Sequence, residues 1–167
     1  KGAYFGYLII PFYYRGQLRY YTARNVIGQG PRYNNPNKDI TGVGKEFIIF
    51  NYDALEMYRS VYICEGALNA LTIGDRGIAT MGKVVSKYQL NELIKAPCQR
   101  YIILLDFDAQ KYAIELALKL IQYKKVKLVL FEDNRDVNDL GRKAVLKKVY
   151  ETRYATYQGL IKLKNSL

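Results

Sequence analysis

The sequence contains no histidine and only two cysteines, Cys64 and Cys98, among its 167 residues. Catalysis by a histidine base, and catalytic triads built on a Ser–His or Cys–His pair, are therefore excluded. Two cysteines without histidine provide neither a disulfide framework nor a zinc site. Any chemistry must use carboxylates, lysines, hydroxyl groups or a bound metal ion.

A long hydrophobic run is also missing. The longest nearly apolar stretch, residues 4–14, is interrupted by Gly and Pro and is too short to cross a bilayer. No signal-peptide pattern opens the chain, and we expect no membrane partner. Hydrophobic residues make up 50% of the sequence, which excludes extended disorder and predicts one core with room for a small additional lobe.

Acidic residues are outnumbered: 26 Lys and Arg face 15 Asp and Glu, for a net charge of +11. The net charge is +4 over residues 1–60, +1 over residues 61–120 and +6 over residues 121–167. Such an excess favours a polyanionic partner, nucleic acid before membrane, although a merely soluble basic protein would show it too. The 17 tyrosines support nucleic acid, because aromatic rings stack on unpaired bases.

The first 60 residues read as a β-rich lobe. Two strands over residues 6–14 and 17–25 form a hairpin around a tight turn, and Pro11 predicts an edge position or a bulge. Residues 27–44 are rich in Gly, Asn and Pro and predict a long loop, which is either functional or mobile. A short strand is expected at residues 47–50.

From residue 60 onward, strands alternate with helices. This alternation predicts an α/β domain with a mostly parallel, Rossmann-like sheet flanked by helices and joined by right-handed crossovers. The expected strands are residues 61–64, 78–80, 101–105 and 126–131. The expected helices are residues 66–74, 86–95, 109–123 and 139–150.

Four carboxylates follow the predicted strands at the points where these strands end. Glu65 follows residue 64, Asp106 and Asp108 follow residue 105, and Asp136 lies shortly beyond residue 131. Ligands of parallel sheets bind beyond the carboxyl ends of the strands, so these side chains are expected at one edge. Crowded carboxylates need a neutralising cation, and hard oxygen ligands suit Mg²⁺.

Each carboxylate also has a plainer interpretation. In an extended segment, Asp106 and Asp108 both face one ion while Phe107 turns into the core, but Asp108 could instead cap the following helix. Glu65 could simply complement a helix dipole. Asp136 could be an ordinary turn or N-cap residue. The occurrence of all three sets, in order and at strand ends, favours the metal site.

These motifs resemble those of a known family. Glu65-Gly66, Asp106-Phe107-Asp108 and the segment 135–139 (RDVND) are similar to the three signature elements of the TOPRIM domain, and the segment 78–82 (IATMG) to a strand and glycine turn of primases. The upstream lobe resembles the basic lobe that precedes TOPRIM in bacterial and phage DnaG-type primases. The segments that carry this second resemblance are 8–12 (LIIPF), 22–24 (TAR), 31–36 (PRYNNP), 44–45 (GK) and 50–51 (FN).

The resemblance implies a primase catalytic-core fragment that synthesises RNA primers on single-stranded DNA from ribonucleoside triphosphates, using Mg²⁺ or Mn²⁺. It implies a basic lobe over residues 1–57, a TOPRIM domain over 58–142 and the start of a helical segment over 143–167. The implied metal ligands are Glu65, Asp106, Asp108 and Asp136, of which the first three are also the implied catalytic residues. The expected contacts with nucleic acid or nucleotide are Arg24, Arg32, Tyr33, Asn35, Lys45 and Lys83.

The resemblance also implies partners and a location. A zinc-binding domain and a replicative helicase are expected to act with this chain from outside it, in the cytoplasm of a bacterium or of a phage-infected cell. Two amides depart from the family pattern: Asn69 and Asn138 stand where many primases carry acids, which lowers the negative charge available for a second metal ion. A TOPRIM-type nuclease and a non-catalytic nucleic-acid-binding module are the alternative functions.

Overall fold

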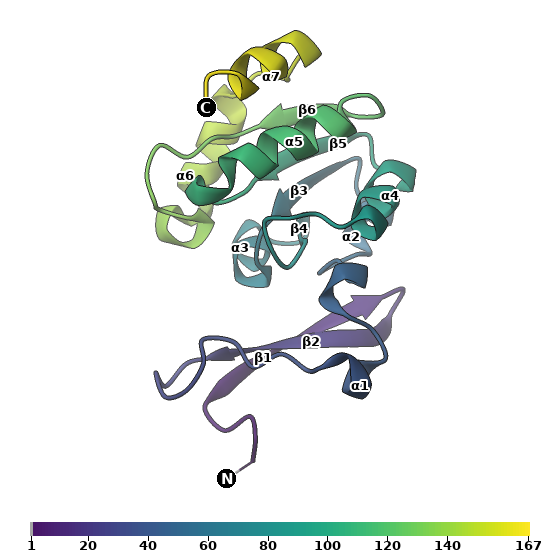
Figure 1. Ribbon diagram of the computed structural model, residues 1–167, viewed down its shortest axis with the longest axis vertical. Coiled ribbons are helices and arrows are strands. Elements are labelled where there is room, and N and C mark those ends of the chain that lie inside the picture. Colours follow the sequence, from purple (N-terminus) through teal and green to yellow (C-terminus); the bar gives the residue numbers. More distant parts are fainter. Residues whose placement is uncertain (1) are drawn as a thin grey trace.

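A computed structural model describes residues 2–167, and its chain begins with the expected hairpin (Figure 1). Strands β1 (Tyr7–Tyr14) and β2 (Gln17–Asn25) pair in antiparallel fashion. The turn residues Arg15 and Gly16 both have positive φ, 49° and 76°, which suits the right-handed twist of a two-residue hairpin. Pro11 is tolerated because each strand of this two-stranded sheet keeps one free edge, as the sequence predicted.

The segment after the hairpin differs from the prediction over residues 38–50. It contains helix α1 (Lys38–Thr41), 3₁₀ helix η1 (Lys45–Phe47) and helix α2 (Ala54–Met57). The strand predicted at residues 47–50 is wrong, because only Phe50 forms a bridge, with Ala79. The side-chain amide of the buried Gln89 donates to the carbonyls of Lys45 and Ile48, which a neighbouring strand would otherwise bind.

The second half forms the predicted parallel sheet, with the strand order β4-β3-β5-β6. The strands are β3 (Ser60–Cys64), β4 (Gly77–Ala79), β5 (Arg100–Leu104) and β6 (Lys125–Leu128). All three pairings are parallel. The mixed α/β fold with a small antiparallel lobe is therefore confirmed, although β6 ends three residues earlier than predicted.

Helices cover both faces of this sheet (Figure 1). Helices α3 (Ala67–Ile73) and α6 (Val137–Glu151) pack on one face, and α4 (Lys87–Lys95), α5 (Gln110–Leu120) and α7 (Tyr157–Lys164) lie on the other. Helix α6 begins two residues earlier than predicted, and α7 lies within residues 143–167, the segment that the family resemblance predicted as helical. Within residues 2–167, every helix is too short or too polar to span a lipid bilayer.

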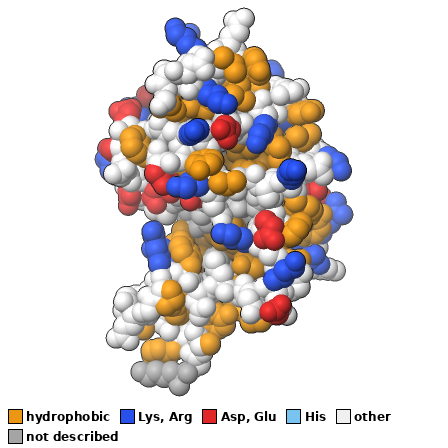
Figure 2. Space-filling view, in the orientation of Figure 1, with side chains coloured by type: hydrophobic (Ala, Val, Ile, Leu, Met, Phe, Trp, Pro, Cys, Tyr) orange, Lys and Arg blue, Asp and Glu red, His pale blue; other side chains and the backbone are white. Residues whose placement is uncertain are grey.

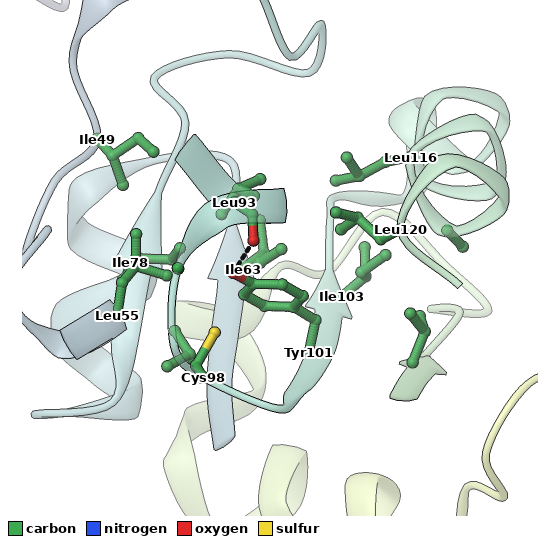
Figure 3. Packing of buried hydrophobic residues seen from close by; sticks show 14 of the residues in the cluster. Ile49, Leu55, Ile63, Ile78, Leu93, Cys98, Tyr101, Ile103, Leu116 and Leu120 are labelled. Carbon is green, nitrogen blue, oxygen red and sulfur yellow. Dashed lines mark hydrogen bonds between the residues drawn. The ribbon is translucent and has the colours of Figure 1, made fainter. Parts of the chain in front are cut away.

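The core is divided between the two faces of the sheet by the alternation of side chains along each strand. Val61 and Ile63 of β3 join the cluster under α4 and α5, whereas Cys64 joins the cluster under α3 and α6. Tyr101 of β5 is fully buried in the first cluster and donates its hydroxyl to the Leu93 carbonyl at 2.7 Å (Figure 3). Strands buried on both faces explain the unbroken apolar runs in the sequence.

The hairpin is fixed to the sheet domain at two points. Phe12 lies in the same buried cluster as Cys64, and its ring centroid is 5.0 Å from that of Phe50. At the hairpin tip, the Arg15 backbone amide donates to the Asp53 carboxylate at 2.6 Å. Because Phe50 also forms a bridge with Ala79 of β4, these contacts hold the hairpin against the edge of the sheet domain.

Gly77 provides a test of the close packing between β4 and α3. A Cβ atom at this position would lie 2.2 Å from the Ala70 carbonyl oxygen, a contact with rigid backbone. We expect Gly77→Ala to lower the free energy of unfolding by about 2–3 kcal/mol, as overpacked core positions do. Urea unfolding followed by circular dichroism measures this loss. Gly66→Ala, which meets no atom within 4 Å, is the control and should change stability by less than about 1 kcal/mol; equal effects would contradict the packing argument.

Candidate active site

Strand register brings two of the predicted acids to one edge of the sheet. Cys64 of β3 lies opposite Leu104 of β5, so the segments that follow them leave the sheet side by side. Glu65 and Asp106 both line a cleft of about 800 Å³ at this edge. Asp136, just before α6, lines the same cleft.

The basic lobe forms the opposite wall of this cleft. Arg24, Arg32, Tyr33, Asn35 and Lys45 all line it, so five of the six predicted nucleic-acid contacts face the acids. Figure 2 shows a group of acidic side chains at the left side of the upper part of the molecule and a basic side chain on the lower part beneath this group. The cleft thus has one acidic and one basic wall, a combination suited to binding phosphate groups beside a metal ion.

Asp106 is partly buried and experiences the charges of several neighbouring carboxylates. Burial, together with the charges of Asp136 and Asp108, raises its pKa to about 6, and Arg32 opposes this shift. Its carboxylate accepts a hydrogen bond from the side-chain amide of Asn69 at 3.1 Å. This carboxylate is therefore held without a cationic hydrogen-bond partner among residues 2–167.

Glu65 is half-buried next to Asp106. Burial and the charges of Asp106 and Asp108 raise its pKa, whereas Lys83 lowers it. One carboxylate oxygen, Oε2, is buried without a hydrogen-bond partner in the part of the chain that the structure describes. The backbone is held by the Gly82 amide, which donates to the Glu65 carbonyl at 3.2 Å.

Asp108 occupies a different position from the one predicted. Residues 107–109 form a 3₁₀ helix, so the side chains of Asp106 and Asp108 do not alternate along an extended strand. The expectation that Phe107 turns into the core is wrong, because Phe107 is 39% exposed. Asp108 is exposed and forms an ion pair with Lys83 at 2.9 Å, outside the main cleft. Lys83, the sixth predicted contact, lines a smaller neighbouring pocket that also includes Glu65 and Lys45.

Asp136 has the structural role of a helix N-cap, which is the alternative that its position in the sequence also allowed. It is the N-cap of α6: its Oδ1 accepts hydrogen bonds from the backbone amides of Asn138 and Asp139 at 2.7 and 3.0 Å. In return, the Asp139 carboxylate accepts from the Asp136 amide, which completes a capping box. Asp139 also lines the cleft, so this box brings a further negative charge that raises the pKa of Asp106.

The carboxylates fit a hard divalent cation in chemistry and charge, but they do not form a finished ligand set. In the described chain, no three acidic or thiol side chains are arranged so that they could hold one metal ion. The reason is visible in the contacts above: Asp108 turns toward Lys83, and Asp136 caps α6. Glu65 Oε2 is buried without a hydrogen-bond partner in the described chain, and burial together with neighbouring carboxylates raises the pKa of Asp106. A bound Mg²⁺ or Mn²⁺ would offset both of these costs.

Arginine and tyrosine stack on the basic wall. The guanidinium carbon of Arg24 lies 4.9 Å from the centroid of the Tyr33 ring, and that of Arg32 lies 5.9 Å from the same centroid. Arg24 and Tyr33 also form a backbone bridge, which fixes the loop against β2. The Nη1 of Arg24 is buried without a hydrogen-bond partner among the described residues and is a donor available for an anionic ligand.

Three polar residues of the cleft were missed as contacts. The sequence marked Asn69 and Asn138 only as departures from a family pattern, and it did not mark Thr72. All three side chains line the cleft and are linked by hydrogen bonds. The available signal was spacing, because Asn69 and Thr72 are three residues apart on one helix face. Asn35, in contrast, was predicted as a nucleic-acid contact, and its Oδ1 accepts a hydrogen bond from the buried Thr22.

Sequence comparisons identify no relative: no protein-family profile and no curated protein matches the chain. Solved structures do match. A DnaG catalytic core superimposes with a TM-score of 0.76 at 18% identity, and the catalytic core of E. coli primase with 0.74 at 16%. Each match covers 97% of this chain and 56% of the other. The primase fragment of the bacteriophage T7 primase-helicase matches with a TM-score of 0.57 at 12% identity, over 87% of this chain and 62% of that one.

The chain has the fold of a primase catalytic core. At these identities the likeness establishes the fold alone, and the chain spans little more than half the length of the primase structures it matches. The two-part architecture of the primase fold nevertheless accounts for the cleft, because its basic lobe faces the strand ends of the sheet.

The unneutralised charge at Asp106 predicts a cost in stability. Because the folded protein holds the pKa of this carboxyl at about 6, above its usual value, the fold is favoured while Asp106 is protonated and loses stability as the pH rises toward 6. We expect Asp106→Asn to raise the free energy of unfolding by about 1–2 kcal/mol above pH 6 in EDTA, after allowance for partial solvent screening, and to change little below pH 4. Urea denaturation at both pH values measures this. A stabilisation that does not depend on pH would contradict the charge argument, and Asp75→Asn, at an exposed position outside the cleft, is the control.

Proposed function

We propose that this chain is the catalytic core of a DNA primase, which joins ribonucleotides into short RNA primers on single-stranded DNA by metal-dependent nucleotidyl transfer. The observation that carries this proposal is the cleft itself. Its acidic wall comes from the strand ends of a parallel sheet, and its basic wall comes from a separate lobe. A nuclease could use the same acids, but it has no need for an opposite, basic wall that holds a template and a nucleotide triphosphate.

The cleft's residues would divide the work between them. Glu65, Asp106 and Asp136 would hold Mg²⁺ or Mn²⁺, with Asp108 joining them after release from Lys83. Such an ion supplies charge neutralisation at the attacking and leaving oxygens of phosphoryl transfer. Arg24 and Arg32 would bind phosphates of the template or the nucleotide, and Tyr33, held between them, would offer its ring to a base. Lys45 and Lys83 flank Glu65 in the adjoining pocket and would bind the triphosphate there.

The function as a whole depends on further protein domains. We infer that a zinc-binding domain, which selects the initiation site, and a replicative helicase act with this chain, in the cytoplasm of a bacterium or of a phage-infected cell. The likeness to a fragment of a primase-helicase supports the helicase as a partner.

The proposed activity is tested by template-directed incorporation of ribonucleotides. The protein is given single-stranded DNA, Mg²⁺ or Mn²⁺, and an annealed RNA primer, which removes the need for an initiation domain. We expect extension of the primer that depends on all four ribonucleotides, and at least about a hundredfold loss in Asp106→Ala and in Asp108→Ala. Asp75→Ala, outside the cleft, should retain activity. Cleavage of the DNA without extension would instead establish a nuclease, and activity in both aspartate variants would refute the site.

The role of the basic wall is tested separately by binding to single-stranded DNA at several salt concentrations. Arg24→Ala and Arg32→Ala should each weaken binding and reduce the slope of log K against log salt by about 0.7, the contribution of one phosphate contact on a single strand. Arg153→Ala, at an exposed position outside the cleft, serves as the control and should leave the slope unchanged. An unchanged slope in both cleft variants would show that the DNA binds elsewhere.

A further inference from the structure

A chain of three polar side chains ends on the Asp106 carboxylate. Asn69 of α3 is only 5% exposed and donates its side-chain amide to Asp106 Oδ1 at 3.1 Å. The carbonyl oxygen of Asn69 accepts a hydrogen bond from the side-chain amide of Asn138 in the first turn of α6. The carbonyl oxygen of Asn138 in turn accepts from the Thr72 hydroxyl, one turn further along α3.

Each hydrogen bond in this series is donated in the direction of Asp106. A carboxylate can only accept, so the amide group of Asn69 must face it, and this fixes the orientation of Asn138 and then of Thr72. Hydrogen bonds aligned in one direction strengthen one another in a partly buried environment. Helices α3 and α6 pack against each other, so this series of hydrogen bonds joins both helices to the loop that carries Asp106. The carboxylate is thereby oriented by the protein before any cation binds.

The chemistry of these amides also sets the charge of the cleft. Asp106 already experiences the negative charges of Asp136, Asp108 and Asp139. An acid at position 69 would place another charge within hydrogen-bond distance of Asp106 and would need a cation between them. The amides at positions 69 and 138 instead fill these places with neutral donors. On the other side, the Lys83 ammonium pairs with Asp108 and provides a positive charge from the protein.

We propose that Asn69 and Asn138 are positioning residues for Asp106, and that together with Lys83 they restrict this centre to one divalent ion per chain. The proposal rests on the metal-dependent function inferred above. In this proposal, neutral amides and a lysine ammonium occupy the positions at which additional carboxylates would bind a second ion.

Manganese binding to the isolated protein, without DNA or nucleotide, tests this proposal. Free Mn²⁺ is measured by electron paramagnetic resonance during a titration of the wild-type chain, which should bind one ion. The variants Asn69→Asp and Asn138→Asp restore an acid at each amide, and the double variant should bind two ions. Asn69→Ala should still bind one ion, about tenfold more weakly, because Asp106 loses the donor that orients it.

Controls separate this effect from added charge and from misfolding. Gln122→Glu adds the same charge at an exposed position outside the cleft and should leave the stoichiometry at one. If Asn69→Asp fails to fold by circular dichroism, the exposed Asn138→Asp decides alone: a second, weaker ion supports the proposal, and an unchanged stoichiometry overturns it. Two ions in the wild-type chain would also overturn it.

The manganese titration, together with the primer-extension assay, distinguishes this proposal from the proposed function. One ion in the wild type and two in the double variant, without any primer extension, would support the single-ion centre and reject primer synthesis by this chain. Primer extension by a wild-type chain that binds two ions would support the function and reject the single-ion centre.

Discussion

The parallel register between β3 and β5 is the constraint on which the cleft depends. Because Cys64 lies opposite Leu104, the residues that follow these strands must leave the sheet side by side, and Glu65 and Asp106 are brought together in spite of their separation in the sequence. Burial, and then the charge of Asp106, raises the pKa of Glu65, and burial with the charges of Asp136 and Asp108 raises that of Asp106. The ionised forms of both carboxyls are therefore unfavourable in the absence of a cation. The sheet is held in this register by side chains buried on both of its faces, so the stability of the core maintains the crowding of charge at its edge.

The basic lobe compensates for this crowding across the cleft. Its hairpin is held in place by the contact of Phe12 with Phe50, which bridges to Ala79 of β4, and by the Asp53 carboxylate at the hairpin tip. These contacts lie away from the acids, so the lobe presents Arg24 and Arg32 to the cleft without pairing them directly with carboxylates. Separate acidic and basic walls leave room for a ligand that carries phosphate and metal together. A closed set of ion pairs would leave no such room.

Much of this arrangement follows from the sequence, because strand alternation and the positions of acids after strands are local patterns. The sheet, the hairpin and the shared edge of Glu65, Asp106 and Asp136 were predicted on that basis. The errors occur where a distant side chain decides the local structure. Gln89 binds the carbonyls that would have made residues 47–50 a strand, and Lys83 holds Asp108 on a 3₁₀ turn away from the cleft. In the series of hydrogen bonds from Thr72 to Asp106, Thr72 and Asn138 are 66 positions apart, and Asn69 and Asp106 are 37 positions apart. Local sequence patterns do not reveal contacts at such separations.

The most direct test of the account is anomalous diffraction from crystals of this chain soaked in millimolar Mn²⁺. The account predicts a single anomalous peak in the cleft, within bonding distance of the Asp106 carboxylate and facing the wall formed by Arg24 and Arg32. The Asp106→Asn variant, soaked in the same way, should lose that peak. A wild-type crystal with no peak beside Asp106, or with its manganese bound only outside the cleft, would contradict the claim that these carboxylates assemble to hold a divalent ion.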